Sequence, residues 1–318
     1  MFSHWGRDCL KYCEKFIEAF NLKQDEPMAD HTSFKVGGTA DLFAVPRSVK
    51  ELTQLVLRSK AHHIPMTLLG SGTNILVRDR GIRGLVICLT GIKKDIKITK
   101  AARNTILVAS SAGTLLSRLG KFAMENGLEG LSFAAGIPGT VGGAVMMNSS
   151  TGSGRISNVI SSVEVLDARG KTLVLGKSHI DFSAREVSFK FPGFDTEHTP
   201  VILGASFELK RGNKEKLKAE WRRRLNARAA TQPVSLPSAG CIFKNPETGR
   251  SAGELIDMAG LKGERCGNAM VSEKHANFIV NLGGASAGDI LKLKKRVGEK
   301  VFELFSVHLK TEVKIEGE

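Results

Sequence analysis

The stretch GLEGLSFAAGIPGTVGGAVMMN, residues 127–148, decides how the rest of the chain is interpreted. It places six glycines and one proline in an otherwise apolar, weakly charged segment. So many glycines predict an irregular, turn-forming segment, because glycine weakens both helices and strands. Glycine also permits positive φ and close backbone approach, so the N–H groups of Gly136, Gly139, Gly142 and Gly143 can point at an anion. A pyrophosphate group is a natural ligand for such a segment.

A second glycine turn, GSGTN at residues 70–74, follows one apolar run and precedes another. Two phosphate-binding loops in one chain fit a dinucleotide. Neither loop has the GxGxxG pattern that opens a helix in Rossmann folds, and the Walker pattern GxxxxGK[ST] is absent. The candidate cofactor contacts are the residues of the two loops: Gly70, Ser71, Gly72, Thr73, Asn74, Gly136, Ile137, Pro138, Gly139, Thr140, Gly142, Gly143 and Ala144.

Length and composition predict an ordinary globular protein of two or three domains. The chain has 318 residues, of which 42% are hydrophobic and 25% are charged. No apolar stretch is long enough to cross a bilayer, and the N-terminal residues are charged where a signal peptide needs an apolar core. These features predict a cytoplasmic protein without membrane insertion. The five cysteines form no CxxC pair, which favours free thiols over disulfides or a zinc site.

The net charge of +14 and the pI near 9.7 would attract any polyanion, so nucleic acid is one candidate partner. Against it, the chain has one tyrosine, two tryptophans and no recognisable nucleic-acid module. Its basic runs, at 214–224 and 292–296, are typical of solvated helix faces. We therefore expect a small anionic ligand and no nucleic acid.

Hydrophobic periodicity predicts an α+β protein in three parts. Residues 1–95 begin with an amphipathic helix and continue as a βαββ pattern, with the helix at 49–61. Residues 96–212 predict a largely antiparallel sheet, a helix at 113–126 and a hairpin turn at 167–170. Residues 213–318 predict helices at 214–230 and 287–305 and a strand at 278–280.

Seven blocks of sequence resemble, in the same order, the signature blocks of the UDP-N-acetylenolpyruvoylglucosamine reductase (MurB) family. The resemblance spans nearly the whole chain. The blocks are HTSFKVGG (31–38), GSGTNILV (70–77), GLEGLSFAAGIPGTVGGAV (127–145), QPVSLPSAGCIFKNP (232–246), AGELIDMAGLKG (252–263), VSEKHANFIVN (271–281) and HLKTEV (308–313).

The resemblance implies a fold, a reaction and its cofactors. The fold would be a two-subdomain FAD-binding module of the PCMH or vanillyl-alcohol-oxidase type, at residues 1–95 and 96–212, plus a smaller α+β substrate-binding domain at residues 213–318. NADPH would reduce FAD, and the flavin would reduce the enolpyruvyl ether of a UDP-sugar to a lactyl ether. The product would be UDP-N-acetylmuramate, a peptidoglycan precursor, made by a monomeric enzyme.

Three residues occupy the family's catalytic positions. Cys241 stands where most relatives carry serine, and its thiol, with an ordinary pKa near 8.5, is protonated at neutral pH and can donate a proton. Glu312 would hydrogen-bond the substrate carboxylate if it is protonated. The guanidinium of Arg185 suits the carboxylate of an enolate-like transition state. The segment differs from the family in having Ala184 where tyrosine is usual.

Three residues are candidates for binding the substrate. Asn245 matches a substrate-contacting position, and Lys244 and Arg228 carry charge suited to a UDP diphosphate. His275 has no second histidine, cysteine or glutamate at helical spacing, so we assign no metal. The tyrosine-bearing substrate loop of one subclass has no counterpart, which places the chain nearer the subclass without it.

One enzyme alternative keeps the same flavin fold. Related FAD domains carry other substrate caps, so a sugar or alcohol oxidase or dehydrogenase is an open reading. The blocks at 232–246 and 271–281 favour the reductase, because they resemble its C-terminal domain.

Overall fold

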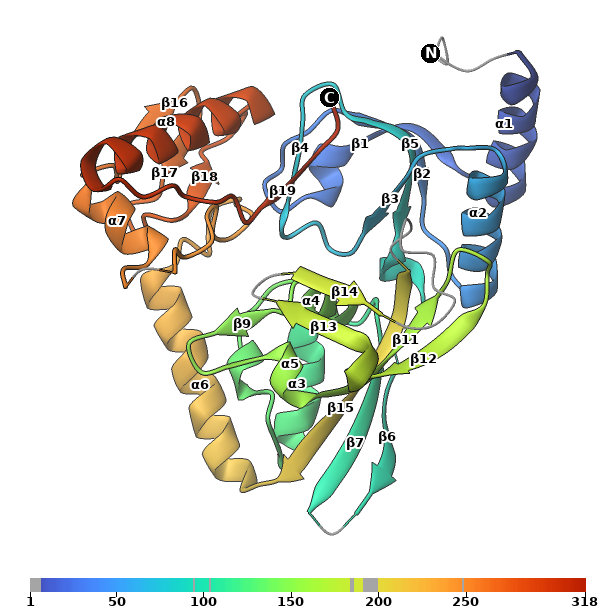
Figure 1. The fold of residues 1–318 in the computed structure, drawn as a ribbon, viewed down its shortest axis with the longest axis horizontal. Helices are drawn as coiled ribbons and strands as arrows, with labels where there is room; N and C mark the ends of the chain where they lie inside the picture. The colour runs from blue at the N-terminus through green and yellow to red at the C-terminus, as the bar shows by residue number, and fades with distance from the viewer. Residues whose placement is uncertain (1–6, 94, 103, 184–185, 191–199, 248) are drawn as a thin grey trace. The chain divides into compact units, whose positions relative to one another are not determined.

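The computed structural model describes residues 7–318 except 94, 103, 184–185, 191–199 and 248 (Figure 1). The chain divides into two compact units, residues 1–25, 42–70 and 84–225 in the first and residues 26–41, 71–83 and 226–318 in the second. Both units mix helices and strands, so the predicted α+β class is confirmed. The division into three domains stays a prediction.

The largest sheet of the first unit is antiparallel throughout, as the sequence predicts. Its order is β12 (Thr172–Gly176), β11 (Ile160–Leu166), β15 (Val201–Arg211), β7 (Thr105–Ser111) and β6 (Ile96–Ala101), and β8 (Leu128–Glu129) pairs with β15. The predicted hairpin turn joins β11 to β12: the amide of Asp167 donates to the carbonyl of Lys171, and Gly170 has a φ of +78°.

Three helices pack on this sheet: α3 (Leu116–Glu125), α4 (Val141–Met146) and α5 (Ile156–Val159). Leu116 and Leu119 of α3 and Val141 of α4 share one core cluster with Val108 and Phe207 of the sheet. All five side chains are fully buried. This close-packed core holds the second half of the glycine-rich stretch, which begins α4, against the sheet.

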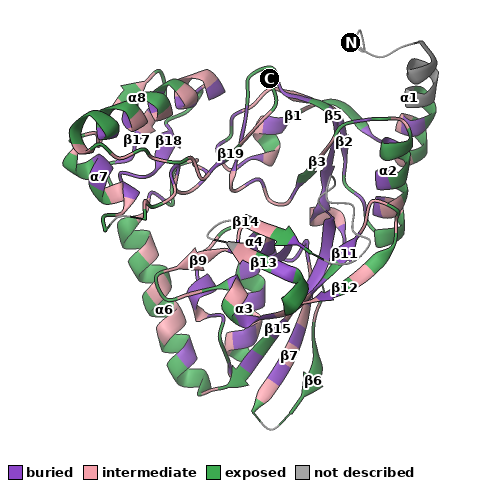
Figure 2. Ribbon diagram, in the orientation of Figure 1, coloured by how far each residue is buried: buried purple, intermediate pink, exposed green. Residues whose placement is uncertain are grey.

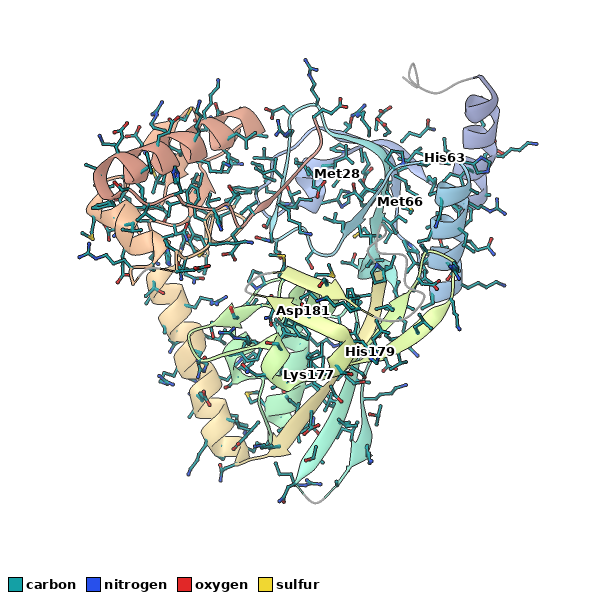
Figure 3. The ribbon with its side chains drawn as sticks, in the orientation of Figure 1. Met28, His63, Met66, Lys177, His179 and Asp181 are labelled. Atoms are coloured by element: carbon teal, nitrogen blue, oxygen red, sulfur yellow. The ribbon has the colours of Figure 1, made fainter. Side chains whose placement is uncertain are left out.

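A second core of the first unit surrounds α2 (Val49–Ala61), whose bounds agree with the predicted helix. Leu52 and Leu55 of α2 bury themselves against Leu85 and Ile87 of β5 (Ile82–Cys88). Met66, labelled in Figure 3, begins β3 (Met66–Leu69) and packs against this core. The sheet here has the order β1 (Lys23–Pro27), β2 (Thr39–Ala44), β5 and β3, with β3 parallel to β5; α1 (Arg7–Phe20) precedes it.

The second unit is built on a three-stranded antiparallel sheet: β16 (Arg265–Cys266), β17 (Ala269–Val271) and β18 (Ile279–Asn281). Its helices are α7 (Ala252–Met258) and α8 (Ala287–Phe305), and α8 has the predicted bounds. On one side of α8, Ile290, Leu293, Val297 and Val301 are buried, while Leu304 is exposed. In the same unit, β4 (Ile75–Val77) pairs in parallel with β19 (Lys314–Glu316).

Helix α6 (Lys214–Thr231) is exposed along most of its surface (Figure 2). Its buried residue is Leu217, and its basic side chains are mostly exposed. The prediction that this basic run forms a solvated helix face is therefore confirmed. No helix in the described ranges combines the length and the apolar character that a membrane span requires.

Candidate active site

The glycine-rich stretch is irregular only in its first part. Up to Thr140 it contains β8 and a short 3₁₀ turn, Ser132–Ala134, but residues 141–146 form helix α4. The expectation of an irregular segment is therefore wrong for these six residues. Two features offset the weakness of glycine in a helix: the hydroxyl of Thr140 accepts a hydrogen bond from the amide of Gly143 (3.3 Å), and Val141 and Val145 are fully buried.

Two of the amides that the sequence assigned to anion binding are used within the protein. The amide of Gly142 donates to the carbonyl of Ala112 (2.9 Å), and that of Gly143 to Thr140. A Cβ added at Gly142 would lie 2.9 Å from the Cβ of Ala112, so tight packing explains this glycine. Gly136 and Gly139, with φ of +71° and +114°, are the glycines that the turn itself requires.

The two glycine loops meet within the first unit. A Cβ added at Gly70 would lie 2.6 Å from the hydroxyl oxygen of Thr140. The main chain of Gly70 therefore lies directly against the residue that caps α4. This approach is open only to glycine, which explains the glycine at position 70.

Buried hydroxyl groups lie in the GSGTN loop and in the turn that contacts the start of α4. Among the described residues, three buried side-chain oxygens have no hydrogen-bond partner, those of Ser59, Ser71 and Thr114. Ser71 is in the GSGTN loop, and the carbonyl of Thr114 accepts the amide of Val141 at the start of α4 (2.8 Å). An unsatisfied buried hydroxyl costs about 1–3 kcal/mol, so a polar ligand that satisfies it is stabilised in return. A dinucleotide, with its phosphates and hydroxyls, fits this need.

Thr114 is a candidate that sequence reasoning missed. It lies between the strand β7 and the helix α3 and belongs to no recognised motif. Only the contact between its turn and the start of α4 reveals it.

The rest of the GSGTN loop is held within the second unit. Gly72 has a φ of +62°, and an added Cβ would overlap the carbonyl oxygen of His31. The amide of Ser33 donates to the carbonyl of Gly72 (3.0 Å), and the hydroxyl of Ser33 donates to the carbonyl of Ser238 (2.6 Å). Ser33, in the HTSFKVGG block, thus joins the loop to the segment that leads into Cys241.

Cys241 and Glu312 lie on neighbouring strand-like segments of the second unit. Cys241 pairs with Phe278, and Phe243 pairs with Thr311. The amide of Glu312 donates to the carbonyl of Ile242 (2.8 Å). The structure therefore brings together two of the three predicted catalytic residues.

Asn277 clamps the segment that carries Cys241. The amide of Ile242 donates to the main-chain carbonyl of Asn277 (2.8 Å), and the side chain of Asn277 bonds both the amide and the carbonyl of Phe243. With 3% exposure, this asparagine acts as a buried strand partner.

Asn74 places Glu312 from the other side. Its side-chain amide donates to the carbonyl of Glu312 (3.4 Å), and its own carbonyl accepts the amide of Lys314 (3.1 Å). The pairing of β4 with β19 continues this contact. A residue predicted to bind the cofactor is thus bonded to a residue predicted to be catalytic.

Arg228, a predicted substrate contact, lies in the last turn of α6 close enough to Cys241 for the two to interact electrostatically. Burial lowers the pKa of its guanidinium, and the charge of an ionised Cys241 would oppose that shift. A guanidinium at this position supplies positive charge for an anionic ligand.

The other two substrate candidates lie on the same segment as Cys241. The side-chain oxygen of Asn245 accepts the amide of Ala252 at the start of α7 (3.1 Å), so Asn245 has a structural contact. The amide of half-buried Lys244 donates to the carbonyl of Lys310 (2.8 Å). Asn245, Lys244 and Arg228 belong to the same unit as Cys241 and Glu312.

Arg185 and Ala184 lie outside the described residues. The described residues before and after them form the strands β13 (Ile180–Ser183) and β14 (Glu186–Phe189) of the first unit, which pair with each other. Figure 3 labels Lys177 and His179, which precede β13, and Asp181, which lies in β13.

His275 has a structural role. Its Nδ1 accepts the amide of Asn277 (3.3 Å), and its ring packs on Phe278 with 4.8 Å between centroids. Burial lowers the pKa of His275, which favours the neutral ring. In the part of the chain that the structure describes, no group of three or more potential metal ligands is found.

Comparisons with known proteins identify the families that the chain resembles. Residues 40–176 match the FAD binding domain family, and residues 232–316 match the C-terminal domain of UDP-N-acetylenolpyruvoylglucosamine reductase. Proteins of that name from Desulfosudis oleivorans and Clostridium novyi are 44% and 41% identical, over 93% and 98% of this chain and 95% and 97% of their own lengths.

A solved structure agrees over the same extent. The crystal structure of UDP-N-acetylenolpyruvylglucosamine reductase (MurB) from Thermus caldophilus covers 93% of this chain and 100% of its own, with a TM-score of 0.74 and 34% identity. The match to the C-terminal domain family favours the reductase over the oxidase alternative. The chain belongs to the UDP-N-acetylenolpyruvoylglucosamine reductase family.

Proposed function

We propose that this protein reduces UDP-N-acetyl-enolpyruvoylglucosamine to UDP-N-acetylmuramate, with NADPH as the reductant and FAD as the bound carrier. The family membership and the FAD binding domain at residues 40–176 support this activity. The reaction adds hydride to one carbon of the enolpyruvyl double bond and a proton to the other, while NADPH becomes NADP⁺.

The residues that would hold FAD are those of the two glycine loops, 70–74 and 136–144, together with Thr114. The contact of Gly70 with Thr140 and the buried hydroxyls of Ser71 and Thr114 support this assignment. When bound, FAD supplies two-electron transfer between the nicotinamide and the substrate.

Cys241 is the proton donor in this proposal. Hydride addition leaves negative charge on the adjacent carbon and the carboxylate of the substrate, and the thiol delivers the proton to that carbon. Asn277 and the neighbouring strands hold the segment of Cys241 rigidly, which keeps its position fixed between turnovers.

Glu312 and Arg185 stabilise the developing charge. A protonated Glu312 donates a hydrogen bond to the substrate carboxylate, and Arg185 pairs with it as a permanent cation. Arg228 and Lys244 supply positive charge for the diphosphate, and Asn245 a polar contact. We also propose three domains, at residues 1–95, 96–212 and 213–318, and a monomer located in the cytoplasm.

The observation that carries the proposal is the bond between the amide of Glu312 and the carbonyl of Ile242, the residue after Cys241, which supports a shared role for Glu312 and Cys241. The test is a comparison of NADPH consumption by FAD-reconstituted protein with and without the enolpyruvyl UDP-sugar. We expect yellow protein that oxidises NADPH rapidly only when the sugar is present. Colourless protein after reconstitution, or equal rates with and without the sugar, would contradict the proposal.

A further inference from the structure

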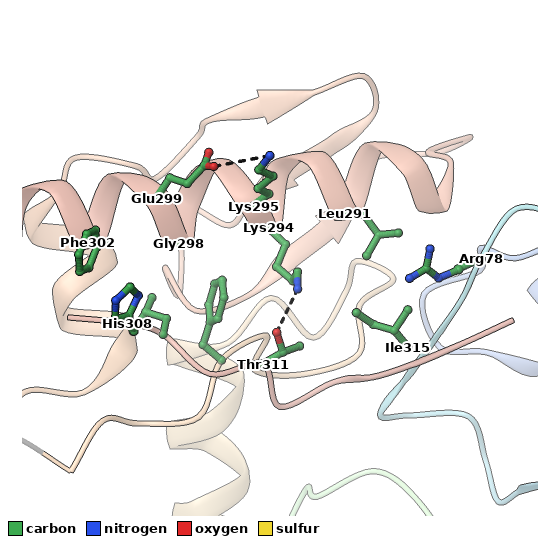
Figure 4. A pocket seen from close by; sticks show the side chains of 12 residues that line it. Arg78, Leu291, Lys294, Lys295, Gly298, Glu299, Phe302, His308, Thr311 and Ile315 are labelled. Atoms are coloured by element: carbon green, nitrogen blue, oxygen red, sulfur yellow. Dashed lines mark hydrogen bonds and ion pairs between the residues drawn. The ribbon is translucent and has the colours of Figure 1, made fainter. Parts of the chain in front are cut away.

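A cavity of about 510 Å³ lies in the second unit between helix α8 and the segment 307–315 (Figure 4). We call it the α8 groove; its walls include Arg78, Leu291, Lys294, Gly298, Phe302 and Thr311. The reductase reaction assigns it no role. Its size is within the range of small-molecule sites.

Two cations reach the α8 groove without an anionic partner. Lys294 extends from α8 and donates to the hydroxyl of Thr311 (3.0 Å), while Arg78 enters from the loop after β4, on the side of Ile315 (Figure 4). Within the described residues, neither Arg78 nor Lys294 forms an ion pair. The third cation, Lys295, is paired with Glu299 (3.7 Å).

The protein environment disfavours the charged form of Lys294. Burial, and then the charge of Arg78, lower the pKa of its ammonium group. An anion bound between the two cations would remove both penalties, because it replaces lost hydration and screens their repulsion. Arg and Lys are the side chains that proteins use for phosphate groups.

The rest of the α8 groove is largely apolar, although Glu299 and His308 also line it. Phe243, Leu291 and Ile315 line it near the cations, and Phe302 stacks on His308 farther along α8, with 4.0 Å between ring centroids. Phe302 is 43% exposed. A ligand with an apolar or aromatic body would cover these side chains.

Gly298 keeps the α8 groove open. It lies inside a 19-residue helix, where glycine is the poorest helix former after proline. Its backbone needs no positive φ, and an added Cβ would meet only the ring of Phe243, at 4.0 Å. Packing therefore does not require glycine here, whereas a larger side chain would fill the cavity.

We propose that the α8 groove binds a small molecule that carries a phosphate group on an apolar or aromatic body. The groove shares Phe243 and Thr311 with the segments of Cys241 and Glu312. A ligand in the groove would therefore contact the segments that carry Cys241 and Glu312. The proposal itself concerns binding alone.

The test is calorimetric titration of the FAD-loaded protein with phenyl phosphate and inorganic phosphate at constant ionic strength. We expect phenyl phosphate to bind more tightly, and Lys294→Met to weaken it about tenfold or more, because a charge-assisted contact is lost. Gly298→Leu should abolish binding by filling the cavity, while Gly298→Ala should retain it.

The matched control is Lys292→Met, which removes the same charge from an exposed position of α8 outside the groove. No binding to the wild type, or equal weakening by Lys292→Met and Lys294→Met, would overturn the proposal. Binding that survives both Lys294→Met and Gly298→Leu would place the phosphate elsewhere and would overturn it as well. Because the readout is affinity, a failure here is separate from a failure of the proposed reaction.

Discussion

The side chain of Asn277 holds the main chain of Phe243 by two hydrogen bonds, accepting from its amide (3.0 Å) and donating to its carbonyl (2.8 Å). An asparagine side chain here replaces a β-strand neighbour. Since Phe243 is two residues from Cys241, the geometry of the proposed proton donor depends on a residue of the block at 271–281, far from Cys241 in the sequence.

Asn277→Ala should therefore lower both stability and turnover. It leaves two buried main-chain groups of Phe243 unpaired, which we expect to cost about 2–4 kcal/mol in the free energy of unfolding. Urea unfolding checks this value. Asn268→Ala, at an exposed asparagine of the same unit, is the control and should change stability little. An equal loss of unfolding free energy in both variants would show that the two hydrogen bonds of Asn277 do not stabilise the fold.

Cys241→Ala should separate the two halves of the reaction. Reduction of the flavin by NADPH needs no proton from Cys241, so its rate should stay near that of the wild type. Reoxidation by the UDP-sugar should slow about 10²- to 10⁴-fold, the usual contribution of a general acid. Stopped-flow absorbance of the flavin measures both rates.

Two further cysteine variants interpret that result. Cys241→Ser should retain part of the activity, because the family resemblance implies serine at this position and a hydroxyl can also donate a proton. Cys266→Ala, at a half-buried thiol elsewhere in the unit, should leave both rates unchanged. If Cys241→Ala slows both halves equally, the cysteine supports structure rather than proton transfer.

Removing the hydroxyl of Ser71 or Thr114 should affect the FAD-free and FAD-bound proteins in opposite directions. Without FAD, Ser71→Ala and Thr114→Ala remove a buried group that has no partner, so stability should stay equal or rise. With FAD, each loses a hydrogen bond to the ligand, and the affinity for FAD should fall about three- to tenfold.

Ser59→Ala is the matched control, because Ser59 is the third such hydroxyl but lies on α2. Its affinity for FAD should equal that of the wild type. Fluorescence titration with FAD and thermal unfolding give the two readouts. Unchanged affinity in both loop variants would remove these hydroxyls from the cofactor site.

Because His275 is partly buried, we expect the folded protein to lose stability in mild acid. Burial lowers its pKa in the folded protein, whereas the unfolded chain has a pKa near 6.5. As pH falls below about 6.5, the unfolded state takes up a proton that the folded state resists, so the free energy of unfolding decreases. Its contribution is fully present above that pH and is lost as pH falls through the folded pKa.

The measurement is urea unfolding of wild type and His275→Ala between roughly pH 8 and pH 5, the range in which histidine titrates. The wild type should show the steeper decline. Parallel curves would show that another group accounts for the acid sensitivity.

Periodicity predicted the elements whose burial is decided locally. The apolar spacing in residues 49–61 and 287–305 gave helices with the observed bounds, because each buries one face against a sheet. The helix at residues 141–146 was missed, since its glycines argue against a helix and only Thr140 and the buried core stabilise it. The hairpin of β13 and β14 was missed too, because its four-residue strands have little periodicity.

The site divides in the same way. Cys241 and Glu312 followed from a resemblance in sequence blocks, and the structure sets their segments side by side. Thr114 lies outside these blocks, and although Ser33 and Asn277 lie within them, the blocks do not show which residues they bond. Their importance arises from bonds or burial among residues far apart in the chain, such as Ser33 and Ser238, which no local pattern encodes.

The parallel pairing of β4 with β19 has a consequence for the order in which the molecule assembles. It joins residues 75–77 to residues 314–316, and contacts between such distant parts of a chain form slowly, after the local helices and hairpins. Glu312 takes its place only when this pairing closes. During refolding, native helical signal should therefore return before enzymatic activity does.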